Sequence, residues 1–202
     1  MSTATLLSDA QFPRFPVRRF SVDEYHRMIQ LGILGEEDNL ELLNGWLVPK
    51  MSRNPPHDVV LVLADGQLRL LLPPDWHIRC QSAITTADSE PEPDLAVVRG
   101  QAPRYSKFHP RAEDIALLVE VAESSLDKDR NEKGPIYAAA GIVCYWILNL
   151  VDEQVEVYTN PTGPSDEPLY RTRTEHKLGD SVSLMVDGTE LGKIEVSPLL
   201  EY

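Results

Sequence analysis

Two short apolar runs, each with one acidic residue, dominate the hydrophobic pattern of the chain. Asp94 follows Pro93 and opens the run 95–98, which turn residues bound and which therefore predicts a buried strand. The second run, residues 115–122, is interrupted only by Glu120. A carboxylate in an apolar strand is costly to bury unless it is paired or bound to a metal. The pattern therefore predicts a functional site that contains Asp94 and Glu120.

Each acidic residue also has a simpler interpretation. Aspartate after proline is typical of a turn, so Asp94 could have only that role. Glu120 shares one side of its strand with Ala116, Leu118 and Ala122, none of which is large. An edge strand or a solvated face would therefore accommodate Glu120 without any function.

The residues before these strands predict a helix and a hairpin. Ser21 is a good N-cap, and Glu24 stands three residues later as its capping-box partner, so a helix should begin here. Residues 39–48 alternate apolar and polar positions around Asn44-Gly45. That dipeptide between two apolar segments is a strong signal for a β-hairpin.

The rest of the chain predicts alternating helices and strands. Apolar residues recur at helical spacing over 57–72, and a second helix should follow Glu123 and end at Gly141. The tail, residues 181–186 and 191–200, should close the sheet and offer apolar contacts for a homodimer. Further strands are predicted at residues 76–81, 144–150, 154–159 and from 169 onward.

Pro135 interrupts the second of these helices. Proline lacks the backbone N–H of a helical residue and disfavours helix at the residue before it, here Gly134. The helix should therefore be kinked, or begin only at Pro135. Both alternatives leave the direction of Lys133 open.

Length and composition favour one globular domain. The 202 residues suit a single domain over 21–202, preceded by a flexible, proline-punctuated arm over 1–20. A membrane-spanning run of about 18 apolar residues and a signal-peptide core are both missing from the sequence. We therefore expect a cytoplasmic protein with no membrane partner. Cys80 and Cys144 fit neither a zinc spacing nor a disulfide framework, so they should be buried core thiols.

The charge balance limits how the chain can bind nucleic acid. Its 19 Lys and Arg against 32 Asp and Glu give a net charge of −13. Phosphate contacts supply most nucleic-acid affinity, so binding should be weak unless basic residues cluster or a metal neutralises the site. The alternative is that these basic residues are only solvated. Three local groups are candidates: Arg14 with Arg18 and Arg19, the loop with Arg99, Arg104, Lys107 and Arg111, and Arg171 with Arg173.

The acidic pair together with a lysine predicts metal chemistry. Two carboxylates on neighbouring strands, joined by Lys133 from the next element, would form a hard-oxygen site suited to Mg²⁺ or Mn²⁺. Taken alone, Lys133 would be an ordinary surface lysine. Such a metal site polarises a phosphoryl oxygen and activates water.

A series of residues in order resembles one known family. The series comprises Pro93-Asp94, Glu120-Val121-Ala122, Lys133, Tyr137, Gly141 and Tyr145-Trp146. It resembles the Uma2 family of endonucleases, a branch of the PD-(D/E)XK nuclease superfamily, from about Ser21 to the C-terminus. The resemblance implies an α/β fold, a restriction-endonuclease-like mixed sheet flanked by helices with an N-terminal helix and a β-hairpin. It also implies a metal-dependent DNA endonuclease.

The resemblance assigns roles to individual residues. Asp94 and Glu120 would hold Mg²⁺ or Mn²⁺ together with the Val121 carbonyl, and DNA would bind weakly with the help of the metal. In the superfamily a lysine stands two residues after the strand glutamate, and here that position is Ala122. Lys133 would replace it, stabilising the pentavalent phosphate or orienting the attacking water.

Three further residues are candidates with open alternatives. Lys128 is a less favoured source of the displaced lysine, and its replacement should be nearly silent. Glu41, in a run that resembles the family's Glu-Leu-Ile-Asp-Gly element, is a third acidic candidate for a second metal or a metal-bound water, or else an exposed strand residue. His57 stands where the family has a histidine, and could contact phosphate or have a structural role in the first helical turn.

A different class of protein remains open. Ala122 and the acidic composition favour a catalytically inert nuclease-like scaffold that acts through protein contacts. The series of Asp94, Glu120 and Lys133 favours the enzyme.

Overall fold

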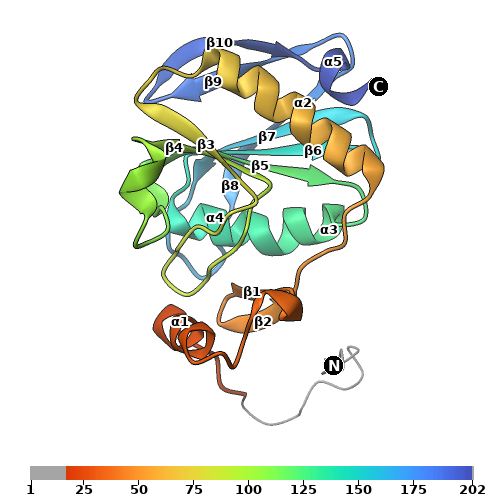
Figure 1. Cartoon of the computed structure of the whole chain (residues 1–202). Coiled ribbons are helices and arrows are strands. Elements are labelled where there is room, and N and C mark those ends of the chain that lie inside the picture. Colours follow the sequence, from red (N-terminus) through yellow and green to blue (C-terminus); the bar gives the residue numbers. More distant parts are fainter. Residues whose placement is uncertain (1–16, 202) are drawn as a thin grey trace.

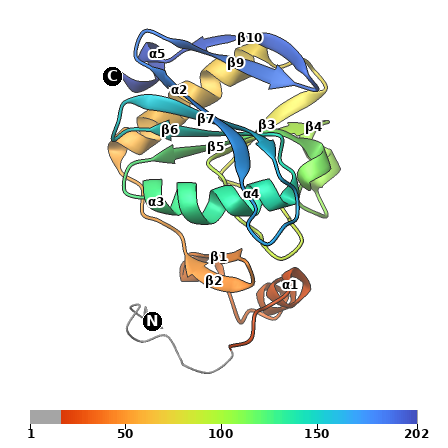
Figure 2. The same ribbon diagram turned by 180° about the vertical axis from the view of Figure 1, so that it is seen from behind.

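A six-stranded mixed sheet divides the protein into two layers (Figures 1 and 2). The computed structural model describes residues 17–201, so most of the predicted arm, 1–16, lies outside the described residues. Neighbouring strands are antiparallel except β5 and β6, which are parallel. In sheet order the strands are β3 (Trp76–Cys80), β4 (Leu95–Arg99), β5 (Ile115–Ala122), β6 (Cys144–Asn149), β7 (Gln154–Pro161) and β8 (Tyr170–Lys177).

Alternation along the central strands builds a separate apolar core on each face of the sheet. In β5, Leu117, Val119 and Val121 join the core beneath α2 (Pro55–Leu71). Leu118 and Ala122 face the second core, which contains Tyr137 and Tyr145. Successive strand residues point to opposite faces, so Glu120 lies on the side of Leu118 and Ala122. That face is closed, and the solvated-face interpretation of Glu120 is wrong because its side chain is buried.

Helix α2 covers one face of the sheet, and a side-chain cap and a proline define its start. Asn54 accepts a hydrogen bond from the His57 N–H at 3.1 Å and so caps the helix, while Pro55 fits the first helical position. One stripe of the helix is buried on the sheet. That stripe comprises Val60, Leu61, Ala64 and Leu68.

The parallel connection between β5 and β6 crosses the other face. It runs through α3 (Leu126–Lys128), the π-helical turn η5 (Asp129–Lys133) and α4 (Gly134–Ala140). The Gly134 N–H donates to the Asp129 carbonyl, a bond that spans five residues. Pro135 lies in the first turn of α4, which begins one residue earlier at Gly134, so the alternative that the helix begins at Pro135 holds to within one residue. The wider turn precedes the proline. Gly141, at a φ of 79°, ends the helix as predicted.

The N-terminal part contains the predicted helix and hairpin. In α1 (Val22–Gln30) the Glu24 N–H donates to Ser21 Oγ at 3.2 Å and the Ser21 N–H donates to Glu24 Oε2 at 3.0 Å, which confirms the capping box. The strands β1 (Leu40–Leu43) and β2 (Trp46–Pro49) form their own two-stranded sheet below α3 and α4 (Figure 1). Short 3₁₀ turns lie at Glu36–Asp38, Ala102–Tyr105 and Ala112–Asp114.

Two expectations about the fold are wrong. The tail does not close the central sheet: β9 (Ser181–Val186) and β10 (Thr189–Glu195) form a separate hairpin, followed by α5 (Ser197–Leu200). This hairpin packs its apolar residues onto the core beneath α2, whereas the outer strand β8 is mostly exposed. Cys144 is buried, but Cys80 is exposed because it ends the edge strand β3.

Among residues 17–201, the helices are all too short or too polar to cross a membrane.

Candidate active site

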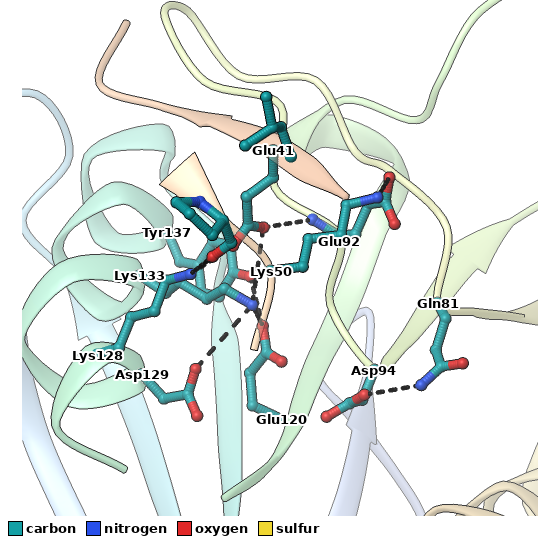
Figure 3. Close-up of polar contacts among 12 residues, drawn as sticks. Glu41, Lys50, Gln81, Glu92, Asp94, Glu120, Lys128, Asp129, Lys133 and Tyr137 are labelled. Atoms are coloured by element: carbon teal, nitrogen blue, oxygen red, sulfur yellow. Dashed lines mark hydrogen bonds and ion pairs between the residues drawn. The ribbon is translucent and has the colours of Figure 1, made fainter. Parts of the chain in front are cut away.

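A cleft of about 300 Å³ lies where β4 begins and β5 ends. The hairpin β1–β2, the start of α2 and the crossover helices contribute its other walls (Figure 3). Its lining includes all four predicted catalytic residues: Glu41, Asp94, Glu120 and Lys133.

Asp94 lies at the start of β4 in a dense set of donors. Its Oδ2 accepts from the Val121 N–H at 2.9 Å and lies 3.0 Å from His57 Nε2, while its Oδ1 accepts from Gln81 Nε2 at 3.2 Å. Burial raises the pKa of Asp94, but the hydrogen bonds and the charge of His57 outweigh burial, and the pKa is lowered. Asp94 is therefore an ionised carboxylate at the cleft, which a turn residue alone would not require.

Glu120 lies on the neighbouring strand in a different environment. The register pairs Leu95 with Val119, so Asp94 and Glu120 follow directly at the same end of β4 and β5. Glu120 Oε1 accepts from Lys133 Nζ at 2.9 Å and from the Tyr137 hydroxyl at 2.7 Å. Burial raises the pKa of Glu120 to about 8, against the charge of Lys133.

Lys133 points into the cleft, not into solvent. Its side chain is 8 % exposed, and its ammonium lies 3.9 Å from Glu41 Oε2 and 4.0 Å from Asp129 Oδ1. Burial lowers the pKa of Lys133, but Glu120, Glu41 and Asp129 outweigh burial and raise it. The π-helical turn places this lysine beside the acidic residues, as the displaced-lysine hypothesis requires.

Glu41 and Lys128 form a second ion pair in the cleft. Glu41 Oε1 accepts from Lys128 Nζ at 2.8 Å, and Glu41 Oε2 accepts from the Glu92 N–H at 3.2 Å. Both side chains are buried, so Glu41 is not an exposed strand residue. The expectation that replacing Lys128 would be silent is also undermined, because removal of its ammonium would leave the buried Glu41 without this partner.

Two site residues were missed by the sequence reasoning. Asp129 is buried at the start of the π-helical turn, and burial raises its pKa. Its position four residues before Lys133 on a predicted helix was the available signal. Gln81, which donates to Asp94, is a neutral residue after a strand, and nothing in the local pattern marks it.

His57 is attached to the acidic residue of β4. It contacts Asp94 at 3.0 Å, and its Nδ1 lies 3.6 Å from Asp58 Oδ1. Burial lowers the pKa of His57, but both aspartates outweigh burial and raise it. The contact with Asp94 supports a role for His57 in holding that carboxylate in position. Its place in the first turn of α2 also fits the structural role.

The donor atoms present fit a hard divalent cation. Asp94 and Glu120 supply carboxylate oxygens, which Mg²⁺ and Mn²⁺ prefer. The Val121 N–H faces Asp94, while the Ala122 carbonyl accepts from the N–H of Leu150, the residue directly after β6. Because a strand residue directs its N–H and C=O to the same side, the Val121 carbonyl faces the Asp94 side. Within residues 17–201, however, His, Cys, Asp and Glu side chains form no ready cluster of three ligands.

The basic loop that follows β4 lies at the wrong end of the strand to serve this cleft. Asp94 precedes β4 and Arg99 ends it, so about 16 Å of extended strand separates them. Arg99 pairs with Asp187, and Arg104 pairs with Asp114. Arg18 pairs with Glu24, Arg173 pairs with Glu156 and Glu175, and Arg14 lies outside the described residues.

The mixed sheet with an acidic pair at the ends of adjacent strands places the protein among nuclease-like α/β folds. A family model described as "Uma2: Putative restriction endonuclease" matches residues 22–191, and the chain belongs to this family. The fold is similar to the crystal structure of "a putative nuclease belonging to DUF820" from Anabaena variabilis ATCC 29413. The TM-score is 0.63 and the sequence identity 12%, over 90% of this chain and 97% of that chain. A comparison with curated proteins finds no match.

Proposed function

We propose that this protein is a divalent-metal-dependent endonuclease that hydrolyses phosphodiester bonds in DNA. The observation that carries the proposal is the arrangement of Asp94 and Glu120 at the same end of adjacent strands, with Lys133 bonded to Glu120 at 2.9 Å. Membership of the family described as "Putative restriction endonuclease" supports the same reaction class.

Each group in the cleft has a distinct role in the proposed reaction. Asp94, Glu120 and the Val121 carbonyl would hold Mg²⁺ or Mn²⁺, which when bound polarises a phosphoryl oxygen and lowers the pKa of a bound water. Lys133 supplies positive charge where the phosphate becomes more negative in the transition state. Glu41 keeps Lys128 in the cleft and adds negative charge near Lys133.

The decisive experiment is a metal titration with circular DNA substrates. Supercoiled plasmid and circular single strands have no ends, so their cleavage in Mg²⁺ or Mn²⁺ demonstrates endonuclease activity. We expect Lys133→Met to lower the cleavage rate about a hundredfold or more while metal still binds. Lys193→Met, at an exposed position of β10, is the matched control and should cleave like the wild type. Wild-type protein that binds metal but cleaves neither circle would contradict the proposal.

A catalytically inert scaffold is the second candidate function. Two observations favour it: the superfamily's lysine position holds Ala122, and residues 17–201 contain no ready cluster of three metal ligands. Metal binding that disappears in Asp94→Ala, without turnover of any nucleic acid by the wild type, would select the scaffold.

A further inference from the structure

The wall of the cleft away from Lys133 is organised around Gln81 (Figure 3). Gln81 follows β3 and has a φ of 45°, a left-handed conformation that non-glycine residues rarely adopt. Its backbone N–H donates to the Asp94 carbonyl at 2.9 Å, and its side-chain Nε2 donates to Asp94 Oδ1 at 3.2 Å. Unusual backbone of this kind persists where surrounding contacts enforce it and is concentrated at functional sites.

The carbonyl oxygen of the Gln81 side-chain amide contacts an arginine. An ionised carboxylate only accepts hydrogen bonds, so Nε2 must face Asp94 and Oε1 must face away. Oε1 accepts from Arg53 Nη1. A chain of hydrogen bonds therefore joins Arg53 to Asp94 through one fixed amide group.

Arg53 differs from the other cations of the cleft. Lys50 pairs with Glu92, Lys128 with Glu41 and Lys133 with Glu120. Of the cationic residues that line the cleft, Arg53 is the one that pairs with no carboxylate within the described range 17–201. Its guanidinium is exposed and keeps donors free for a bidentate contact with an anionic oxygen pair.

We propose that Arg53 binds a backbone phosphate of the DNA strand beside the bond to be cleaved, and that Gln81 positions Arg53 relative to Asp94. This inference rests on the proposed function. Phosphate contacts set the register of a bound strand. In a protein of net charge −13, one cation free of acidic partners at the cleft should carry a large share of the binding.

Binding of a short fluorescent DNA duplex, followed by anisotropy in Ca²⁺, tests the role of Arg53. We expect Arg53→Ala to raise the Kd at least tenfold, and Arg53→Lys to recover part of this loss because charge returns without the bidentate geometry. In Mg²⁺, Arg53→Ala should raise KM and leave kcat within about threefold. Lys193→Ala, which removes an exposed cation of β10 outside the cleft lining, is the matched control and should change neither constant.

Gln81→Ala tests the positioning role with a readout besides activity. It should weaken both DNA binding and metal binding measured by calorimetry, whereas Arg53→Ala should leave metal binding unchanged. If the wild type binds and cleaves DNA but Arg53→Ala behaves like Lys193→Ala, this inference fails and the proposed function stands. If the wild type neither binds nor cleaves DNA with metal present, both fail.

A different observation concerns the outer face of α2. Opposite its buried stripe, Val59, Val62 and Leu70 are 41 %, 70 % and 80 % exposed, with Gly66 between them on the same side. Their spacing of three and four residues makes one continuous apolar stripe. A helix that is apolar on both faces is ordinarily buried on both. We therefore expect another protein surface to cover this stripe.

Charges beside the stripe indicate which partner fits. Asp58, near the N-terminus of α2, and Arg69, near its C-terminus, lie on the same flank of the stripe and are both exposed, and Arg69 also pairs with Asp65 of its own helix at 2.7 Å. In an antiparallel pair of α2 helices related by a two-fold axis, Asp58 of one copy meets Arg69 of the other, twice. The surface is thus self-complementary, as a two-fold dimer requires.

We propose that a second copy of this chain packs its α2 antiparallel on this stripe. Size-exclusion chromatography with light scattering should give a dimer for the wild type, and Val62→Glu should give a folded monomer because position 62 is exposed within each subunit. Asp58→Arg alone should weaken the dimer, and the double change Asp58→Arg with Arg69→Asp should restore it. A monomeric wild type, a dimeric Val62→Glu variant or a failure of the double change to restore association would each overturn the proposal.

Discussion

Buried glutamates of this protein differ in pKa because their partners differ. Glu120 is surrounded by other acids and closed off from water, and burial raises its pKa to about 8. Glu156 is fully buried as well, yet Arg130, Tyr158 and Asn149 donate to its carboxylate. Burial raises the pKa of Glu156, but these donors outweigh burial and lower it to about 2. The balance between burial and neighbouring acids on one side and hydrogen-bond donors and cations on the other thus decides which buried carboxylate is ionised.

The raised pKa of Glu120 predicts that metal binding releases a proton. The folded pKa exceeds the unfolded value, so the proton on Glu120 stabilises the metal-free fold below about pH 4.5, and this contribution is lost as the pH rises through about 8. Metal requires the ionised carboxylate. We expect Mg²⁺ affinity to rise from pH 6 to pH 8.5, with proton release measured by calorimetry in buffers of different ionisation enthalpy. Equal affinity at both pH values would contradict this account.

Glu156 predicts the opposite pH dependence for stability. Its folded pKa is depressed, so its contribution is present above about pH 4.5 and is lost as the pH falls toward about 2. Glu156→Gln should lower the free energy of unfolding by about 2 kcal/mol at pH 7, since the partly exposed arginines are screened by solvent. Denaturant unfolding at pH 7 and pH 3 checks this, and the difference between wild type and variant should shrink at pH 3. Glu175→Gln, an exposed partner of Arg173, is the control.

At the scale of elements, the π-helical turn explains how a lysine enters the site from outside β5. The bonded Asp129 carbonyl and Gly134 N–H belong to residues five positions apart, one more than in an α-helix, and this extra residue directs both Asp129 and Lys133 toward Glu120. π-Helical turns inside α-helices occur often at functional sites. Pro135, which cannot donate a backbone hydrogen bond, follows the wider turn.

The space at Gly134 predicts a test of this turn. A Cβ atom there would lie 3.3 Å from the Asp129 carbonyl oxygen, which also accepts from the Tyr145 hydroxyl at 3.2 Å. Gly134→Ala should therefore lower the melting temperature despite the higher helix propensity of alanine. Gly66→Ala, in open space within α2, is the matched control and should stabilise by about 0.5–1 kcal/mol. A stabilising Gly134→Ala would show that the turn relaxes freely.

At the scale of the whole molecule, the apolar cores stabilise the fold, whereas repulsion among the acidic residues of the cleft destabilises it. The two apolar cores on either side of the sheet contain most of the buried residues. Glu41, Asp94, Glu120 and Asp129 meet at the edge of these cores, with Lys133 and Lys128 offsetting part of their repulsion. A bound cation would offset more of that repulsion.

Divalent metal should therefore stabilise the whole fold. A ligand that binds only the folded state at about 100 times its Kd adds about 2.7 kcal/mol. We expect Mg²⁺, Mn²⁺ and Ca²⁺ to raise the melting temperature of the wild type, and Asp94→Asn to abolish the rise. Asp75→Asn, an exposed residue before β3, should retain the rise in full. An unchanged wild-type melting temperature at saturating Mg²⁺ or Mn²⁺ would rule out the metal site.

The sequence by itself determined the elements and the main acidic residues. Short continuous apolar runs identified the strands of Asp94 and Glu120, capping chemistry identified the start of α1, and Asn44-Gly45, at φ of 49° and 78°, identified the hairpin. These signals act within a few residues, so they are readable without the fold.

Only the tertiary structure decided which side chains meet. Lys128 joined the site because the hairpin brings Glu41 beneath α3, and Gln81 joined it because β3 ends beside Asp94. The loop after Arg99 lies outside the site because strand β4 separates it from Asp94. The tail forms its own hairpin because its apolar residues pack onto the core beneath α2. Such contacts join residues far apart in the chain, and the packing of whole elements sets their distances.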